Sequence, residues 1–465
     1  MKKIFIEETI TRIGEEVELY GWAETIRDHK KVVFVDLRDS TGIVQIVGGP
    51  QLSEISSEDV VRVTGVIKSR PDNLINDKIP TGKIEIELKD FTIISKSNSL
   101  PLPIDTDGYE VDEEVRHNYR YLDLRRKRML KNLRTRSEVI TFMRDFLTKR
   151  RFIEIETPIL TKTSPEGARD FIVPSRLQRG KFYALPQSPQ QYKQLLMVAG
   201  IERYFQIARC FRDEDPRADR AYGEFTQLDI EMSFVTQEDI LELTEQLFTE
   251  LIKKVFPHKK IKESPWPRIS HKETIEKYKS DRPDLRKNKE DKDELAFAWI
   301  VDFPLFTEQS QEDFYHGMGK SKYAPSHHMF TAPRQEDIPL LDKDPGKVRG
   351  LQHDLVLNGF EVGGGSIRIH DPKIQEKVFT LIGFTQEQKD RFSDLLEAFT
   401  YGVPPHGGIA PGLDRFLMVI LGEPSIREIV AFPASSSGKT AVMHAPSTVE
   451  KEQLEELGIN IHEGK

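Results

Sequence analysis

A dense group of charged residues stands out at positions 211–220, where Phe-Arg-Asp-Glu-Asp is followed at once by Pro-Arg-Ala-Asp-Arg. Apolar residues dominate on both sides, at 204–208 and 225–234, so we expect a charged loop between two buried antiparallel strands. The planar guanidinium of arginine binds phosphate or carboxylate through two parallel hydrogen bonds. Such a loop could therefore hold a polyphosphate from a rigid base, although the pattern alone also fits an ordinary solvated loop.

A second candidate group lies near the C-terminus, where residues 361–366 read Glu-Val-Gly-Gly-Gly-Ser. Three glycines in a row allow another group to approach the backbone closely. Asp354 and Glu361 flank this region, and two carboxylates can hold Mg2+ together with phosphate oxygens. At 412–415, Gly-Leu-Asp-Arg opens a predicted helix, which places Arg415 near the positive end of that helix, where phosphate binding is favoured.

One phosphate-binding pattern is only apparent. Residues 437–440 read Ser-Gly-Lys-Thr, like the end of a P-loop. That motif requires glycine five residues before Gly438, and this chain has Pro433 there. The sequence therefore predicts no P-loop.

Composition limits the class of protein. The 465 residues are 37% hydrophobic and 31% charged, with a formal net charge of -8. No run approaches the roughly 18 apolar residues of a membrane span, and residues 1–8 do not resemble a secretory signal. The single cysteine, Cys210, rules out an intrachain disulfide and a cysteine-based zinc site. We expect a cytoplasmic protein of roughly two to four domains that is not a nonspecific nucleic-acid coat protein, although a local basic patch could still bind RNA.

Residues 1–104 are rich in short strands separated by Gly, Asp and Ser turns. Five strands in so short a stretch favour a five-stranded oligonucleotide-binding (OB-fold) barrel, because closure removes exposed edges. Another small sandwich is the alternative. The predicted strands are 16–22, 32–37, 43–47, 60–67 and 83–89.

Residues 105–136 are predicted to be a hinge or linker, acidic at first and basic from 116 onward. The basic part could be a solvated face or a surface that contacts RNA phosphates. Residues 137–465 change to helical periodicity without regular strand–helix alternation, which predicts an α+β domain on an antiparallel β-sheet flanked by helices. In this domain we expect helices at 136–147, 239–255, 386–399 and 413–421, a strand at 152–156, and a surface excursion at 257–298.

Three motifs in order carry a family resemblance. Residues 156–158 (Glu-Thr-Pro), 211–214 (Phe-Arg-Asp-Glu) and 412–415 (Gly-Leu-Asp-Arg) resemble motifs 1, 2 and 3 of class II aminoacyl-tRNA synthetases. Longer stretches are similar to the bacterial aspartyl enzymes of that class. They lie at 164–171, 187–193, 224–229 and 363–370, with an N-terminal barrel resemblance at 21–22 and 34–39.

The resemblance implies an N-terminal anticodon-binding OB-fold barrel and a class II catalytic domain, assembled as a homodimer with the Pro158 region at the interface. It implies ATP and Mg2+ as cofactors, with L-aspartate first activated to aspartyl-adenylate. The aspartyl group is then transferred to tRNA(Asp), and tRNA(Asn) is a further candidate acceptor.

The resemblance also implies individual roles. Arg212 should bridge the α-phosphate and the reacting carboxylate, Glu214 should contact the adenine, and Arg415 should hold the far phosphates. The expected ATP-binding residues are Arg212, Glu214, Glu361, Gly412, Leu413, Asp414 and Arg415, with Asp354 and Glu361 as metal ligands. The expected aspartate-binding residues are Glu166, Ser188, Gln190, Lys193, Arg212, Gln227, Asp229, His327 and Arg368. The expected anticodon-binding residues are Arg27, His29, Phe34 and Gln45.

The chain departs from the family pattern in four places. Met329 replaces the proline of the His-His-Pro-Phe pattern. The stretch 217–225 is one residue longer and lacks a glutamine that contacts ATP. Thr25 and Ile26 replace two of the three arginines before Asp28. Finally, 257–298 is far shorter than the family's insertion domain, so we expect that domain to be missing or reduced.

Two rival functions remain at this point. An asparaginyl enzyme would share the fold, but two cations, Lys193 and Arg368, aimed at one side chain favour a carboxylate over an amide. A catalytically inactive RNA-binding paralogue would be expected to lose arginines such as Arg212 and Arg415, which are present.

Overall fold

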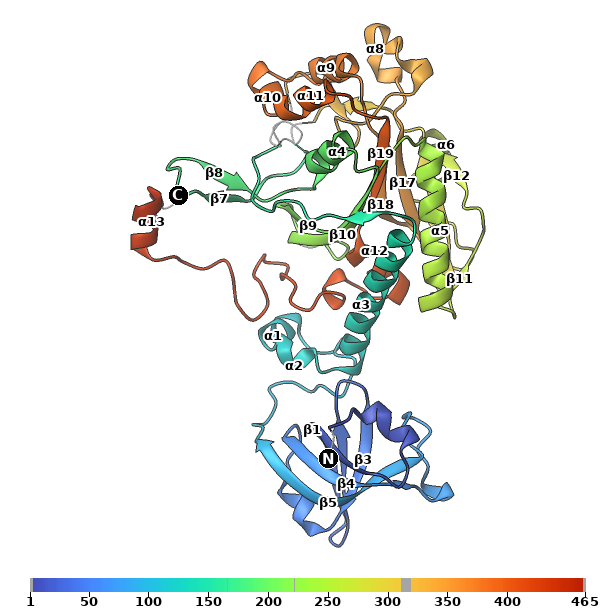
Figure 1. Ribbon diagram of the computed structural model, residues 1–465, viewed down its shortest axis with the longest axis vertical. Coiled ribbons are helices and arrows are strands. Elements are labelled where there is room, and N and C mark those ends of the chain that lie inside the picture. The colour runs from blue at the N-terminus through green and yellow to red at the C-terminus, as the bar shows by residue number, and fades with distance from the viewer. Residues whose placement is uncertain (1–2, 165, 221, 311–318, 463–465) are drawn as a thin grey trace. The chain divides into compact units, whose positions relative to one another are not determined.

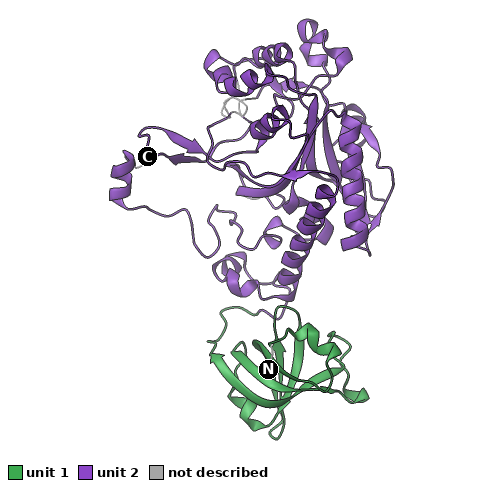
Figure 2. Ribbon diagram, viewed as in Figure 1, with its two compact units in different colours: residues 1–103 green, residues 104–465 purple. Residues whose placement is uncertain are grey.

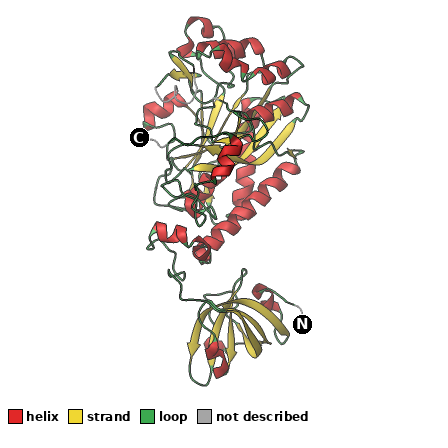
Figure 3. Cartoon of the chain, turned by 90° about the vertical axis from the view of Figure 1, so that its left-hand side faces the viewer, coloured by secondary structure: helices red, strands yellow, loops and turns green. Residues whose placement is uncertain are grey.

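The computed structural model describes residues 3–164, 166–220, 222–310 and 319–462 (Figure 1). The chain forms two compact units, residues 1–103 and 104–465 (Figure 2). None of the helices described is long and apolar enough to cross a membrane. The first unit consists of strands and loops with short 3-10 helices at Ile6–Thr11, Pro50–Glu54 and Asp72–Leu74, whereas the second mixes longer helices with strands (Figure 3).

The first unit is a closed barrel with strand order β1-β2-β3-β5-β4. Its strands alternate between buried and more exposed residues, as the pattern along Val33–Arg38 shows, so each strand sends every second side chain into the barrel. The predicted five-stranded barrel is confirmed. Its strands are β1 (Glu16–Asp28), β2 (Val33–Arg38), β3 (Ile43–Gly48), β4 (Val60–Ser69) and β5 (Ile84–Ser95).

The second unit is built on an eight-stranded sheet of order β12-β14-β17-β18-β19-β10-β9-β6. Its neighbours are antiparallel except at the two edge pairs, β12–β14 and β6–β9. The predicted α+β domain on a largely antiparallel sheet is therefore confirmed. The strands of this sheet are β6 (Ile153–Glu154), β9 (Arg203–Arg212), β10 (Gly223–Ser233), β12 (Arg268–Ser270), β14 (Phe297–Val301), β17 (Gln352–Leu357), β18 (Phe360–Ile367) and β19 (His406–Pro411). Three two-stranded sheets comprise β7 (Ile172–Pro174) with β8 (Phe182–Ala184), β11 (Lys260–Ile261) with β13 (Glu294–Leu295), and β15 (Phe306–Glu308) with β16 (Tyr323–Pro325).

The helices supply the rest of the core. Apolar residues of α3, α5 and α12 share one buried cluster with strands of the large sheet. A second cluster joins α9 and α11 to the loop before β17. The helices are α1 (Glu113–Asn118), α2 (Arg120–Asp123), α3 (Lys127–Thr148), α4 (Gln190–Val198), α5 (Gln237–Val255), α6 (His271–Tyr278), α8 (Leu340–Lys343), α9 (Pro372–Leu381), α10 (Gln386–Asp390), α11 (Ser393–Phe399), α12 (Leu413–Leu421) and α13 (Lys451–Leu457).

Two predicted helices differ in extent. Helix α3 begins at Lys127, nine residues before the predicted start, and its first two turns mix lysines and arginines with Met129, Leu130 and Leu133. The helix predicted over 386–399 is broken at Phe392, whose ring is fully buried and stacks near Phe384. Tertiary packing of that ring overrides a continuous helical pattern.

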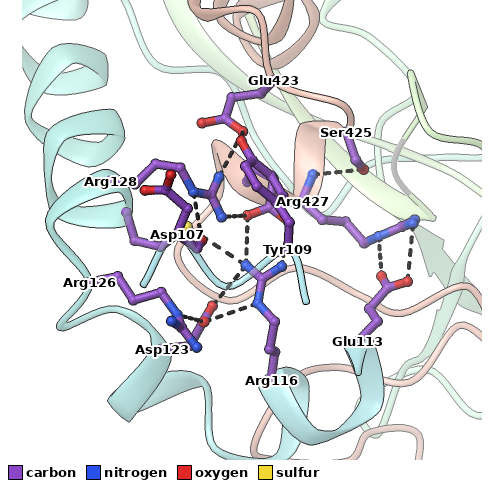
Figure 4. Close-up of polar contacts among 12 residues, drawn as sticks. Asp107, Tyr109, Glu113, Arg116, Asp123, Arg126, Arg128, Glu423, Ser425 and Arg427 are labelled. Atoms are coloured by element: carbon purple, nitrogen blue, oxygen red, sulfur yellow. Dashed lines mark hydrogen bonds and ion pairs between the residues drawn. The ribbon is translucent and has the colours of Figure 1, made fainter. Parts of the chain in front are cut away.

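The predicted linker, 105–136, is packed into the second unit. Arg116, Arg120 and Arg126 each make an ion pair with the buried carboxylate of Asp123, at 3.0, 2.8 and 2.7 Å. Figure 4 shows the pairs of Arg116 and Arg126. Glu428 adds two more pairs, at 2.7 Å each, with Arg116 and Arg128. The basic residues that join this ion cluster therefore stabilise the fold, and they are not a free surface for RNA phosphates.

The segment 257–298 is also more than a surface excursion. Strand β12 extends the large sheet beside β14, and β11 pairs with β13. Trp266 is buried and stacks on Phe297 with ring centroids 4.1 Å apart. This short segment therefore contributes an edge strand of the large sheet.

Candidate active site

Strands β10 and β18, helix α12 and the charged loop after β9 surround a cavity of about 280 Å³. The loop does connect two paired antiparallel strands, as the sequence predicted. The cavity also brings together three groups that are far apart in sequence. Its lining includes Arg212, Glu214, Asp219, Arg220, Gln227, Glu361, Gly364, Gly412, Asp414 and Arg415. Of the residues expected to bind ATP, only Leu413 lies elsewhere, fully buried in the hydrophobic core.

Arg415 is held by two backbone carbonyls. Its Nη1 donates to Glu361 O at 2.7 Å and its Nε donates to Asp219 O at 3.1 Å. These bonds tie the first turn of α12 to β18 and to the charged loop. The guanidinium is thus fixed at the cavity wall, which is the preorganisation that binding a phosphate requires.

Arg212 stands at the end of β9, with its guanidinium 5.1 Å from the centroid of the Phe225 ring. Its buried Nε has no hydrogen-bond partner among the described residues. A buried donor without a partner is costly, so this geometry suits an anionic ligand that would accept from it. Glu214, expected at the adenine, makes an ion pair with Arg220 at 2.7 Å, so an adenine contact would compete with that pair.

The predicted metal ligands meet beside the glycine run. A Cβ placed on Gly364 would lie 3.0 Å from Asp354 Oδ1 and 3.7 Å from Glu361 Oε1. Burial and the nearby Asp354 raise the pKa of Glu361, as expected for two carboxylates sharing one site. No group of three or more acidic, histidine or cysteine side chains suited to a metal occurs in the described part of the chain. The two carboxylates fit Mg2+, which takes one or two carboxylates and completes its shell with phosphates and water.

The glycine run itself is dictated by packing. A Cβ on Gly365 would lie 2.0 Å from Gly408 O and 2.8 Å from His353 Nε2. Gly412 is the opposite case, since a Cβ there meets no protein atom within 4 Å. The cavity side of Gly412 is therefore open.

The expected aspartate-binding cations sit in a buried four-charge network. Lys193 Nζ lies 2.6 Å from Asp229 Oδ1 and 3.3 Å from Glu231 Oε2. Arg368 Nε and Nη2 donate to the two oxygens of Glu231 at 3.0 and 3.1 Å. Burial opposes ionisation of Glu231, but Arg368 and Lys193 outweigh it and lower its pKa to about 2. For Asp229, burial dominates and raises the pKa.

Glu231 was not among the predicted site residues. It follows Gln227 and Asp229 along β10 at intervals of two, so all three side chains point to the same face of the sheet. This spacing could have identified it from the sequence.

His327 and His328 face different groups. His327 Nε2 lies 3.1 Å from both oxygens of Asp354, so the histidine predicted to close on aspartate instead contacts a candidate metal ligand. Burial alone would lower the pKa of His327, but Asp354 raises it. His328 is partly buried, and desolvation followed by the charges of Arg368 and Lys193 lowers its pKa to about 3.

The tautomer of His328 follows from its contacts. The backbone N–H of Phe330 donates to His328 Nδ1 at 3.3 Å, which leaves the ring proton on Nε2. That Nε2 has no hydrogen-bond partner within the described residues. His328 thus offers an unused donor close to Arg368, and only the doubled histidine hinted at it in the sequence.

Of the other aspartate candidates, Glu166 and Ser188 line a second cavity, Gln190 is the first residue of α4, and Gln227 lines the ATP cavity. Glu166 accepts from Ser164 Oγ at 2.6 Å and from Ser188 Oγ at 3.0 Å, beside that second cavity of about 410 Å³. Gln190 Nε2 donates to Gln194 Oε1 at 3.1 Å. Lys193 and Arg368 do not line this second cavity, so the structure does not bring all the predicted aspartate residues into one open pocket.

In the barrel, the anticodon candidates form one polar group. Arg27 makes two hydrogen bonds to Asp36, at 2.7 and 2.9 Å, and a third to Gln45 Oε1 at 3.1 Å. Gln45 Nε2 donates to Glu85 at 3.0 Å. The rings of His29 and Phe34 meet edge to face at 5.8 Å. A base contact by Gln45 would therefore require an exchange of hydrogen-bond partners.

Comparisons with known proteins agree with this division. Residues 112–436 match the family of tRNA synthetases class II (D, K and N), and residues 17–94 match the OB-fold nucleic acid binding domain. The chain is 40% identical to the aspartate--tRNA(Asp/Asn) ligase of Rubrobacter xylanophilus, over 97% of this chain and 95% of that protein. It is also 40% identical to the ligase of the same name from Syntrophomonas wolfei, over 97% of each.

Solved structures show the same fold. Asparaginyl-tRNA synthetase from Pyrococcus horikoshii complexed with asparaginyl-adenylate is similar with a TM-score of 0.75 at 22% identity, over 93% of this chain and 98% of that one. Aspartyl tRNA synthetase from Entamoeba histolytica gives 0.71 at 23% identity, over 93% of this chain and 91% of that one.

Proposed function

The chain belongs to the class II tRNA synthetases of the D, K and N family, and we infer that it is an aspartate–tRNA ligase acting on tRNA(Asp) and tRNA(Asn). The observation that carries this is 40% identity to aspartate--tRNA(Asp/Asn) ligases along 97% of the chain. ATP–pyrophosphate exchange tests it. Exchange should depend on aspartate, and dependence on asparagine or no exchange at all would contradict the function.

The first step is attack of the aspartate α-carboxylate on the α-phosphate of ATP, with pyrophosphate leaving. No protein nucleophile is needed, because catalysis rests on alignment and charge stabilisation. Arg212, with an unpaired buried Nε, is placed to neutralise charge on the α-phosphate and the attacking carboxylate. Arg415, which lines the same cavity, binds the far phosphates. Asp354 and Glu361 would hold Mg2+, whose charge would help to offset that of the phosphates.

Recognition of the aspartate side chain is assigned to Lys193 and Arg368. Asp229 and Glu231 hold these cations in place. The unpartnered Nε2–H of His328, near the charges of Arg368 and Lys193, is a further donor, and a carboxylate can accept from all three whereas the NH2 of an amide cannot. The expected result is an aspartate Michaelis constant far below that of asparagine in the exchange assay.

Relaxed tRNA selection is proposed for His29 in the barrel. The aspartate and asparagine anticodons differ only at the third base, C against U, which present an amino donor and a carbonyl acceptor there. Neutral imidazole has one donor and one acceptor nitrogen, so His29 can satisfy either base. The edge contact with Phe34 places its ring beside the residue proposed to stack on a base. Charging assays with the two transcripts decide this, and a preference of more than about 100-fold for tRNA(Asp) would contradict it.

A homodimer is proposed around β6 and Pro158. Ile153, Ile159 and Leu160 are 51%, 46% and 51% exposed, and contiguous exposed apolar residues mark interaction surfaces. Within the described residues, strand β6 is also an edge strand of the large sheet. Light scattering should give twice the mass of 53.6 kDa, and a monomer would contradict the proposal.

The short segment 257–298 is proposed to stand where relatives carry a larger insertion. The alignment with the Rubrobacter protein spans 582 positions, more than the 465 residues of this chain, which supports the proposal. A cytoplasmic location is also proposed, because the one cysteine, Cys210, is free and buried and no disulfide depends on an oxidising compartment.

A further inference from the structure

Helix α3 carries a stripe of three polar side chains, Arg128, Asn132 and Arg136, each four residues after the last. Residues four apart lie on the same face of a helix, one turn above another. All three side chains contact the segment that contains α12 and the residues just after it. The stripe therefore holds the helix that carries Arg415.

Arg128 and Asn132, at the N-terminal end of the stripe, hold the residues that follow α12. Arg128 donates to Glu423 at 2.7 Å, as Figure 4 shows, and Asn132 Nδ2 donates to Glu423 at 2.6 Å. Asn132 also donates to the backbone carbonyl of Glu428 at 3.1 Å. These contacts tie down the chain directly after α12.

Arg136, at the C-terminal end of the stripe, contacts a residue that lines the ATP cavity. Arg136 donates to Asp414, and the backbone N–H of Thr226 donates to the other carboxylate oxygen at 2.9 Å. The side chains of Arg136 and Asp414 are only 17% and 7% exposed. Asp414 lines the cavity and immediately precedes Arg415. A buried carboxylate thus faces the ligand space, and its charge is offset by an arginine outside the cavity lining.

We propose that Arg136 is a positioning residue for ATP, acting through Asp414 on the first turn of α12. This rests on the proposed function, because it takes Arg415 as the group that binds the far phosphates. Two effects combine. The ion pair fixes the turn that carries Arg415, and it neutralises a carboxylate that would otherwise repel the triphosphate across a poorly solvated cavity.

The test measures Michaelis constants for ATP and aspartate in pyrophosphate exchange, together with the melting temperature. Arg136→Met should raise the ATP constant about 30-fold, the loss typical of truncating one partner of a buried charge pair. The aspartate constant should stay within about twofold, because Arg136 pairs with Asp414, which is not among the residues expected to bind aspartate. Arg136→Lys should recover most of the ATP affinity, since it keeps the charge.

The control lies on the same helix. Arg144 pairs with Glu154 at 3.0 Å but is 47% exposed, so Arg144→Met should leave both constants unchanged. The double variant Arg136→Met, Asp414→Asn should bind ATP better than Arg136→Met alone, because the repelling charge is gone. If Arg136→Met folds poorly, the ATP constants of Arg136→Lys alone and of Arg136→Lys with Asp414→Asn are compared instead.

Three outcomes would overturn the inference: an equal rise in both constants, an equal effect of Arg144→Met, or a further loss of ATP affinity on adding Asp414→Asn. They are distinct from failure of the proposed function, which would appear as no aspartate-dependent exchange in the unaltered protein.

Discussion

Two segments of this chain are rich in charged residues, yet their charges have different roles. In the segment from Arg116 to Arg128, arginine side chains pair with the buried Asp123 and with Glu428, which is distant in sequence. The loop after β9 lines a cavity and leaves the Nε of Arg212 without a partner among the described residues. Charge density is therefore a poor guide to a binding site. At Arg212 it is the buried donor without a partner, and not the density of charge around it, that indicates a ligand.

The largest effect is expected on folding, from Asp123→Ala. Three buried guanidiniums would lose their shared carboxylate, and breaking a buried pair costs about 3–5 kcal/mol. Urea unfolding should show this loss in the free energy of unfolding. Glu428→Gln, which keeps the shape of that side chain, serves as the second variant if Asp123→Ala does not fold. Unchanged stability in both would mean that the cluster is not a structural element.

Arg212→Ala should impair catalysis and leave the stability of the fold nearly unchanged. Removing a preorganised charge at a developing anion costs about 3–4 kcal/mol of transition-state stabilisation, a loss of several hundred-fold in exchange rate. The melting temperature should stay close to that of the unaltered protein, because no other described group depends on the Nε of Arg212. A variant that exchanges normally would remove Arg212 from its assigned role.

Arg368→Leu should weaken both aspartate binding and the stability of the fold, each by less than the two preceding variants. It should raise the aspartate Michaelis constant about 30-fold, some 2 kcal/mol, and leave that for ATP nearly unchanged. It should also lower the melting temperature, because Glu231 would remain buried without its main partner. Lys193→Leu gives the parallel measurement, and equal effects on aspartate and ATP would show that these cations do not read the side chain.

Acid should weaken the ion cluster and the aspartate pocket together, more gradually than any substitution. The folded pKa values of Asp123 and Glu428 are lowered because arginine partners outweigh burial, and the pKa of Glu231 is lowered to about 2. Groups with depressed pKa values stabilise the fold above their ordinary range, near 4, and lose that contribution as pH falls toward 2. The free energy of unfolding should decline over that interval, and less steeply in Glu428→Gln. A decline that is equally steep in the variant would exclude Glu428 as a contributor.

Local patterns accounted for the barrel strands, the charged loop between β9 and β10, and helix α12. These depend on neighbours in sequence, so alternation and helical periodicity reveal them. The partner of Arg116 is different, since Glu428 lies 312 residues away and no spacing rule joins them. His328 could not be separated from His327, because only packing shows which ring is enclosed by cations. The assigned roles of Glu166, Ser188 and Gln190 stay predictions. Glu166 and Ser188 line the second cavity, and Gln190 lies in α4 and bonds to Gln194.

Gly412, which lines the ATP cavity, and Gly365, inside the glycine run of β18, should differ in their tolerance to sequence change. At Gly365 any larger side chain would overlap the backbone of the adjacent strand, so even alanine should be rejected whether or not the enzyme is working. At Gly412 the protein leaves room for a methyl group, and the backbone there lies in the extended region that every residue adopts. A library of variants screened first for folding and then for growth dependent on the enzyme should therefore separate the two positions. Gly365 should be lost in the first screen, and alanine at Gly412 only in the second, when nucleotide has to occupy that space.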